Sequence, residues 1–321
     1  MADVALVPAP RASRAQRTAT LAVVLIPFLG LIAAISFLWG RGVTWVELSL
    51  LLGVYAASGL GVTVGFHRLF THRSFETARP VKFLLAVLGS MSVEGPLLKW
   101  AAMHRRHHQH SDQVEDPHSP HGFGGGVRGV LAGLWHAHVG WMFAADPPNL
   151  SRYVPDLHSD KLLRNASRLF AAWAILGLLI PTVLGGFLTG TWMGAWLGFI
   201  WGGLVRIFLV HHMTWSINSV CHLWGRQPFR SRDQSRNNFF FGVMGFGEGW
   251  HNNHHAFPTS ARHGLRWWEL DLSYLVIRVL TLLGLAWRVR LPAVVAVAAQ
   301  RRAVGLEPDA PGLDDGMTAS G

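Results

Sequence analysis

The sequence has a single cysteine, Cys221, and few charged residues. One cysteine excludes an intrachain disulfide, and it excludes a zinc or iron–sulfur site whose ligands are all cysteines of this chain. Charged residues make up 14% of the 321 residues and apolar residues 50%, whereas soluble domains are about 25% charged. Together with 15 tryptophans and 18 phenylalanines, which suit anchoring at a bilayer interface, this composition indicates an integral membrane protein.

Acidic residues are fewer than basic ones. The chain has 18 acidic residues and 28 lysines and arginines, which gives a net charge of +10. The arginines are scattered through segments that flank apolar runs, without the aromatic-interleaved patches of RNA-binding proteins. We therefore expect attraction to an anionic membrane leaflet or to an anionic substrate head group, and no nucleic-acid partner.

Four apolar runs approach the roughly 20 residues that cross a bilayer. They cover residues 21–38, 46–64, 169–188 and 193–210. The two short connections within these pairs hold little charge, so the positive-inside rule places both termini and the long middle segment in the cytoplasm, at a bacterial inner membrane. A further apolar stretch, residues 81–98, is interrupted by Glu94 and a Gly-Pro pair, which favours an interfacial or re-entrant helix.

The sequence thus predicts an all-α integral membrane protein with one main domain, residues 19–304. Four transmembrane helices are expected to carry a cytosolic helical cap built from residues 65–165 and 218–304. Residues 1–18 are expected to form a cytosolic arm, and residues 305–321, rich in Gly, Asp and Pro, a disordered tail.

Histidines at metal-ligand spacing are the main chemical signal of the chain, and they fall into three clusters. Two clusters have the i, i+3, i+4 spacing that places three imidazoles on one helix face: His104, His107 and His108, and His251, His254 and His255. In the remaining cluster, His67 and His72 are five residues apart, about 140° around a straight helix. They converge only if the helix ends or bends between them.

Asn218 and His222 lie four residues apart after the fourth apolar run and add one amide and a ninth imidazole. Nine nitrogens exceed the three or four ligands of one zinc ion and suit two metals of higher coordination number. Imidazole accepts zinc, copper, iron or nickel, but a lipid setting favours iron, because attack on an unactivated C–H bond requires dioxygen activation. The other histidines are expected at the surface or in hydrogen bonds around the ligands.

These motifs, in this order and membrane context, resemble the membrane fatty acid desaturases, and most closely their acyl-CoA Δ9 (stearoyl-CoA) branch. The likeness covers roughly residues 20–290. The run Val93-Glu-Gly-Pro96 resembles actinobacterial members. The motifs that carry the likeness are Gly65-Phe-His-Arg-Leu-Phe-Thr-His-Arg-Ser74, Trp100-Ala-Ala-Met-His-Arg-Arg-His-His108, Asp116-Pro-His-Ser119, His138-Val-Gly-Trp141, Thr214-Trp-Ser-Ile-Asn-Ser219, His222-Leu-Trp-Gly225 and Gly247-Glu-Gly-Trp-His-Asn-Asn-His-His255.

The resemblance implies a centre of two iron ions, with Asn218 holding a water on one of them. Its implied ligands are His67, His72, His104, His107, His108, His222, His251, His254 and His255. It also implies a bent tunnel for an acyl chain, with Trp100, Thr214 and Trp215 around the bend and Glu94 beside it, where animal enzymes carry glutamine. Tyr55 matches a residue at the closed end of the tunnel, and Gly59 lies one turn nearer the metals.

The implied reaction uses dioxygen and two electrons to place a cis double bond at the Δ9 position of a long-chain saturated acyl-CoA. The electrons would come from a separate ferredoxin, rubredoxin or flavin reductase. Ala102 and Met103 replace an Arg-Asp pair that contacts coenzyme A in animal enzymes, and Ala144 and Ala145 replace basic residues, so acyl-lipid and acyl-carrier substrates stay open. Two other hypotheses are a histidine-box hydroxylase with a similar site and a metal transporter, which predicts histidines along a path within the spans.

Overall fold

The computed structural model describes residues 12–144 and 147–302. The predicted tail at 305–321, Ala145 and residues 1–11 of the predicted arm lie outside this range. Within it, four helices are long and apolar enough to cross a membrane, which confirms the predicted helical membrane fold. They cover Arg14–Gly40, Trp45–Thr71, Phe170–Thr189 and Trp192–Ser219, so the second and fourth continue well past the apolar runs at 46–64 and 193–210.

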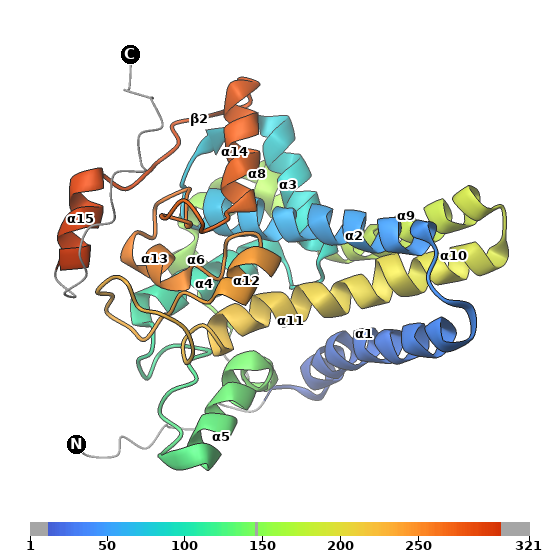
Figure 1. Cartoon of the computed structure of the whole chain (residues 1–321), viewed down its shortest axis with the longest axis horizontal. Coiled ribbons are helices and arrows are strands. Elements are labelled where there is room, and N and C mark those ends of the chain that lie inside the picture. The colour runs from blue at the N-terminus through green and yellow to red at the C-terminus, as the bar shows by residue number, and fades with distance from the viewer. Residues whose placement is uncertain (1–11, 145–146, 303–321) are drawn as a thin grey trace.

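The four long helices lie side by side, with the two short connections between paired helices at one end of the molecule (Figure 1). The first is α1 (Arg14–Arg41), and the third is α9 (Phe170–Thr189). The second joins α2 (Trp45–Leu60) to the π-helix η1 (Gly61–Thr71), and the fourth joins α10 (Trp192–Gly198), the π-helix η3 (Phe199–Val205) and α11 (Arg206–Ser219). Apolar side chains such as Leu29 and Phe187 are exposed to 59% and 80% on these helices, as expected where lipid covers them.

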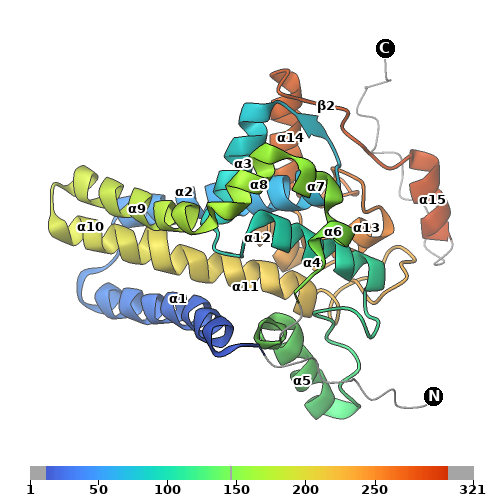
Figure 2. The ribbon, with the colours of Figure 1, turned by 180° about the vertical axis from the view of Figure 1, so that it is seen from behind.

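The remaining elements gather at the opposite end of the long helices and form a helical cap (Figure 2). The cap contains α3 (Arg79–Met91), α4 (Leu97–His110), α5 (Gly126–His138), the 3-10 helix η2 (Gly140–Phe143), α6 (Leu150–Tyr153), α7 (Pro155–Ser159), α8 (Lys161–Arg168), α12 (Phe239–Met244), α13 (His251–Ala256), α14 (Leu272–Leu282) and α15 (Val294–Arg302). Two short antiparallel strands, β1 (Glu76–Thr77) and β2 (Ala286–Trp287), pair with Glu76 opposite Trp287.

A core of buried apolar residues joins the end of η1 to the cap. It includes Phe66 and Phe70 of η1, Leu97 of α4 and Ile277 of α14. The helix η1 packs closely against α3, because a side chain at Gly61 would bring its Cβ within 2.2 Å of the backbone nitrogen of Gly89. This close approach fixes the end of the second long helix against the cap, where the histidines lie.

The interrupted stretch at 81–98 forms two helices rather than one. It is divided between α3 and α4 by a loop at residues 92–96, in which Val93 has a φ of 66° and Gly95 a φ of 108°. A β-branched residue with positive φ is an unfavourable conformation that its surroundings must impose. The loop carries Glu94 toward the interior.

Candidate metal centre

The structure brings all nine of the predicted ligand histidines together at the end of the long helices. They come from the end of η1, from α4, from the residues after α11 and from α13. Within each of two groups, one ring nitrogen per histidine lies within 4.8 Å of the others. The first group is His67, His72, His104, His108 and His254, and the second group is His107, His222, His251 and His255.

The π-helical form of η1 explains how His67 and His72 converge. In a π-helix each amide bonds to the carbonyl five residues earlier, and here the amide of His72 donates to the carbonyl of His67 at 3.1 Å. Residues five apart therefore lie on the same side, and the two imidazole centroids are 4.7 Å apart. The sequence-based expectation was an end or a bend between them; the helix does end between them, at Thr71, and it is also widened into a π-helix from Gly61.

The spacing of the ring nitrogens fits metal ligation. In the first group, the Nε2 atom of His254 lies 3.1 Å from that of His67 and 2.9 Å from that of His108. In the second group, the Nε2 atoms of His222 and His251 are 3.1 Å apart. Two nitrogens at right angles on one ion, each about 2.1 Å from it, are about 3.0 Å apart.

Unsatisfied ring nitrogens give a second indication. The Nε2 atoms of His72, His107 and His255 are buried and have no hydrogen-bond partner among the described residues. A buried polar atom without a partner is costly unless it binds something. The two groups therefore fit two metal ions held by imidazole nitrogens, which suit late first-row transition metals.

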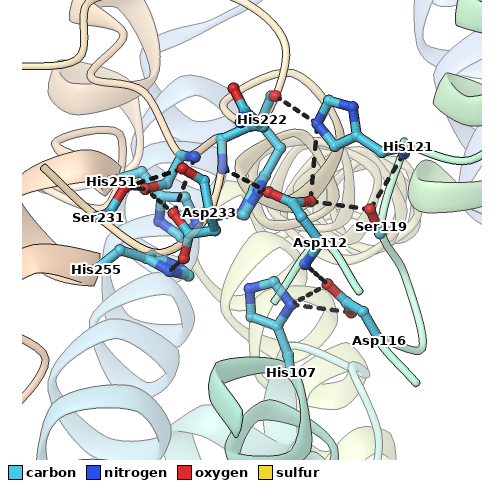
Figure 3. A network of polar contacts seen from close by, with 12 residues as sticks. His107, Asp112, Asp116, Ser119, His121, His222, Ser231, Asp233, His251 and His255 are labelled. Carbon is cyan, nitrogen blue, oxygen red and sulfur yellow. Dashed lines mark hydrogen bonds and ion pairs between the residues drawn. The ribbon is translucent and has the colours of Figure 1, made fainter. Parts of the chain in front are cut away.

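Carboxylates fix the outer nitrogens of four of these imidazoles. The Nδ1 atom of His107 lies 3.0 Å from Asp116, that of His222 lies 2.9 Å from Asp112, and that of His255 lies 2.5 Å from Asp233 (Figure 3). In the first group, the Nδ1 atom of His67 pairs with Glu248. Such partners orient each ring so that Nε2 points inward, and they increase the basicity of the ligand.

Sequence analysis assigned no role to these four carboxylates, although Asp116 and Glu248 lie inside its motifs. Asp112 and Asp116 closely follow His108, and Glu248 precedes His251 by three residues, so a search for acidic residues near the histidines would have found these three. Asp233 lies 22 residues before His255, in a loop with no recognisable motif. Its role is visible only in the folded chain.

The carboxylates are ionised well below neutral pH. Burial would raise the pKa of Asp112, but the hydrogen bond and charge of His222 and the amide of Gln234 lower it to about 2. Burial would also raise the pKa of Asp116 and of Asp233. Their histidine partners outweigh burial, so the pKa of each carboxyl is lowered. Negative charge is thus held at the outer side of the imidazoles.

Most of the imidazoles are neutral at physiological pH, as ligation requires. Burial and the neighbouring histidines lower the pKa of His104, His108 and His254 well below the usual value. In His255 burial outweighs the opposing effect of Asp233 and lowers the pKa to about 4. His107 differs, because Asp116 overcomes the effect of burial and raises its pKa.

Two arginines within the histidine motifs hold η1 in place. Arg68 is fully buried and pairs with Glu248 at 2.6 Å and with Asp271 at 3.0 Å. Arg105 of α4 donates to the carbonyls of Phe70 and Thr71 at 2.8 and 3.0 Å, where η1 ends. These contacts stabilise the position of His67 and His72, and sequence analysis did not identify them.

Three further histidines lie against the ligands. His121 Nε2 is 3.1 Å from the carbonyl of His222, and the ring of His118 is 4.5 Å from that of His107. His263 is buried, with its ring 4.5 Å from that of His254.

Two cavities meet beside the metal groups. A cavity of about 50 Å³ is lined by Tyr55 and Gly59, and a cavity of about 670 Å³ is lined by Glu94 and Trp215. Both cavities share Trp100, His104, Thr214 and Asn218 as lining residues. The structure therefore places all six candidate tunnel residues and Asn218 on cavity walls.

The smaller cavity is also lined by a residue that sequence analysis did not single out, Phe246. Its ring centroid is 5.4 Å from that of Tyr55, whose hydroxyl donates to the carbonyl of Met244 at 2.8 Å. A Cβ at Gly59 would lie 2.5 Å from Phe246 Cε2. Gly59 thus faces the Phe246 ring at close range.

Glu94 lines the larger cavity. Its Oε2 accepts a hydrogen bond from Trp100 Nε1 at 3.0 Å, and its carboxyl also accepts one from Thr214. Its Oε1 is buried and has no partner within the described part of the chain. Burial is the main cause that raises the pKa of Glu94 to about 7, so the carboxyl is about half protonated at neutral pH and mostly protonated in mild acid.

The loop that carries Glu94 is anchored by the fourth long helix. Arg206 is fully buried and donates to the carbonyls of Met91 at 2.5 Å and Gly177 at 2.8 Å. His211, which lies in neither metal group, hydrogen bonds to the backbone of the same loop.

Comparison with known proteins identifies a family and several relatives. A family model described as "Fatty acid desaturase" matches residues 43–280. A hex-5-enoyl-[acyl-carrier protein] acetylenase of Moorena producens is 48% identical over 87% of this chain and 88% of its own. An sn-1 stearoyl-lipid 9-desaturase of Anabaena variabilis is 38% identical over 82% and 92%, and an icosanoyl-CoA 5-desaturase of Limnanthes douglasii is 36% identical over 84% and 72%.

The chain belongs to the membrane fatty acid desaturase family. It is an oxidoreductase of that family and a multi-pass membrane protein with four candidate spans. The relatives are named for carrier-linked, lipid-linked and CoA-linked chains, so family membership does not extend to the acyl-CoA branch. Met103 and Ala144, which stand where animal enzymes carry charged residues, line the larger cavity.

Proposed function

We propose that the protein is an oxygen-dependent desaturase that introduces a cis double bond into a fatty acyl chain linked to a membrane lipid or to an acyl-carrier protein. One observation carries this proposal: nine imidazoles, six buried and three half-buried, form two groups beside the cavities, and His104 lines both cavities. The Δ9 position is part of the proposal and rests on the name of the lipid-linked relative.

The two cavities would position the acyl chain. The smaller cavity would take the methyl end of the chain, and Tyr55 and Phe246 would set how far it enters. The larger cavity would take the carboxyl end and its carrier. Holding a chain in this way fixes which methylene groups face the imidazole groups, so the position of reaction follows from proximity.

The ligand assignment is also proposed. The nine histidines and Asn218, the latter through water, would hold two iron ions, which supply the dioxygen activation that removal of hydrogen from a saturated chain requires. Trp100 stacks on His104 with centroids 5.0 Å apart and with Val62 and Ile217 lines the smaller cavity. These apolar walls exclude water from the reacting carbons.

The balanced reaction is –CH2–CH2– + O2 + 2 e⁻ + 2 H⁺ → –CH=CH– + 2 H2O. The electrons would come from a separate ferredoxin, rubredoxin or flavin reductase, since the single cysteine excludes an all-cysteine cluster in this chain. By the charge bias, the cap and both termini would face the cytoplasm at a bacterial inner membrane.

Expression in a desaturase-deficient bacterial host tests the function. Gas chromatography–mass spectrometry of the lipid-bound and carrier-bound fatty acids should show a new double bond with the wild-type chain and none with His254→Ala. Saturated acids alone would contradict the proposal. Hydroxylated acids without alkenes would favour a histidine-box hydroxylase instead.

A further inference from the structure

The loop between α11 and α12 presents exposed arginines directly above the second metal group. We call residues 224–238 the arginine loop; it carries Arg226, Arg230, Arg232 and Arg236. The first three are exposed, and Arg236 is half-buried. The loop begins beyond the end of α11, at the end of the molecule opposite the turn between α9 and α10 (Figure 1).

The exposed charge of this loop is entirely positive. Its one acidic residue, Asp233, is 8% exposed and is paired with His255. Trp224, exposed to 52%, adds an aromatic surface beside the arginines. A positive surface with an exposed aromatic residue is complementary to an acidic protein, and such complementarity steers encounter and orientation.

Direct polar contacts connect this surface to two ligand histidines. Asp233 follows Arg232 in the chain, and its Oδ2 lies 2.5 Å from His255 Nδ1. The amide of Gln234 donates at 2.7 Å to Asp112 Oδ2, which lies 2.9 Å from His222 Nδ1 (Figure 3). The loop thus reaches His255 directly through Asp233, and it reaches His222 through one hydrogen bond to Asp112.

The arginine loop is held in a defined shape. Arg226 and Asn237 exchange backbone hydrogen bonds at 2.9 and 2.6 Å. The side chain of Asn237 donates to Asn253 of α13 at 2.7 Å, and the amide of Phe229 donates to Asn252 at 2.8 Å. A partner would therefore meet a pre-formed surface, which reduces the entropic cost of binding.

We propose that the arginine loop is the docking surface for an acidic one-electron carrier of the ferredoxin class. The proposal rests on the proposed function, which consumes two electrons per double bond. Each docked, reduced carrier passes one electron toward the second group past Asp233–His255 and Asp112–His222, and leaves oxidised. Two such encounters, with two protons from solvent, complete the balance given above.

Charge reversal in the arginine loop tests this proposal. The variant Arg226→Glu/Arg230→Glu/Arg232→Glu is compared with a matched control, Arg128→Glu/Arg152→Glu/Arg168→Glu, which reverses three exposed arginines on α5, α6 and α8. The full-length protein in lipid nanodiscs is supplied with a reduced plant-type [2Fe–2S] ferredoxin. At low salt, the loop variant should show a KM for ferredoxin raised about tenfold or more, and the control should match the wild type.

Two further measurements separate docking from damage to the site. Turnover driven by dithionite, which needs no protein docking, should be unchanged within about twofold in the loop variant. Binding of ferredoxin to the metal-free protein should weaken in the loop variant and persist in Arg226→Lys/Arg230→Lys/Arg232→Lys. In the wild type, high salt should lower the ferredoxin rate toward that of the variant.

The outcomes are distinguishable. An unchanged KM in the loop variant, or an equal loss in the control, overturns the docking proposal. Loss of binding to vesicles of anionic lipid with ferredoxin binding intact also overturns it and makes the loop a lipid contact. No product from the wild type with either reductant contradicts the proposed function instead.

Discussion

The two metal groups are built in different ways. In the first group, one histidine of five, His67, has a carboxylate partner within the described residues, and the group depends on the π-helix η1 and on α4 and α13. In the second group, three of four histidines have carboxylate partners, and those carboxylates lie in loops after α4 and α11. The first group is thus positioned mainly by packed helices, and the second also by largely buried carboxylates of two loops.

This difference has a functional consequence. The arginine loop supplies Asp233, the partner of His255, and its Gln234 amide donates to Asp112, the partner of His222 (Figure 3). We therefore expect electrons to enter at the second group. The first group lines both cavities through His104, and the second group lines the smaller cavity through His251.

The largest expected effect comes from removing one ligand of either group. His254→Ala in the first group or His107→Ala in the second should lose iron and abolish activity, because each leaves its ion short of ligands. Metal analysis of the purified protein and product analysis check both variants. Full activity in either one would remove that histidine from the ligand set.

Asp112→Asn and Asp233→Asn, which disturb the second group through its partners, should reduce metal affinity or activity by roughly 10–100-fold. Glu115→Gln, an exposed neighbour with a side chain 64% accessible, serves as the control. Titration of the metal-free protein with Fe²⁺ measures the affinity. Equal binding in all three variants would show that the loop carboxylates do not position this group.

Changes at the closed end of the smaller cavity should alter chain length and leave both metal groups occupied. Phe246→Ala should favour longer chains, and Gly59→Phe shorter ones, by roughly tenfold or more for a change of two carbons, since one methylene in a pocket is worth about 1–3 kcal/mol. Competition between acyl chains of different length gives the ratio. An unchanged profile in both variants would mean that the methyl end lies elsewhere.

The smallest expected effect concerns Glu94, beside the first group. In the unfolded chain Glu ionises near about pH 4.3, and in the folded protein burial raises the pKa to about 7. The stability that Glu94 contributes is therefore fully present below about pH 4.3 and is lost as the pH rises through about 7. The stability of Glu94→Gln should not fall in this way, because glutamine does not ionise. Its melting temperature minus that of the wild type should therefore increase by a few degrees from about pH 5 to about pH 8. A difference that stays constant over this range would contradict the raised pKa.

The sequence predicted which histidines come together, because their spacing along a helix is a local property. The i, i+3, i+4 trios of α4 and α13 point three rings one way wherever a helix forms, and the apolar runs identified the four long helices. The convergence of His67 and His72 was expected, but its cause, the π-helix, was not, because a change of hydrogen-bond register has no sequence signature here.

The supporting residues were predicted poorly because they depend on long-range contacts. Asp233 reaches His255, Arg68 reaches Asp271 and Phe246 reaches Gly59 only in the folded chain. The carrier of the acyl chain could not be predicted from the motifs, since relatives of the same family are named for different carriers. Residues at the metals thus indicate the chemistry, and residues on the cavity walls are needed for the substrate.

The most direct test of the two-group centre is anomalous diffraction at the iron absorption edge from crystals of the purified protein. We predict two anomalous peaks, one inside the first group and one inside the second, with Asp112→Asn/Asp233→Asn weakening the second peak alone. A single peak, or a peak outside both groups, would contradict the account.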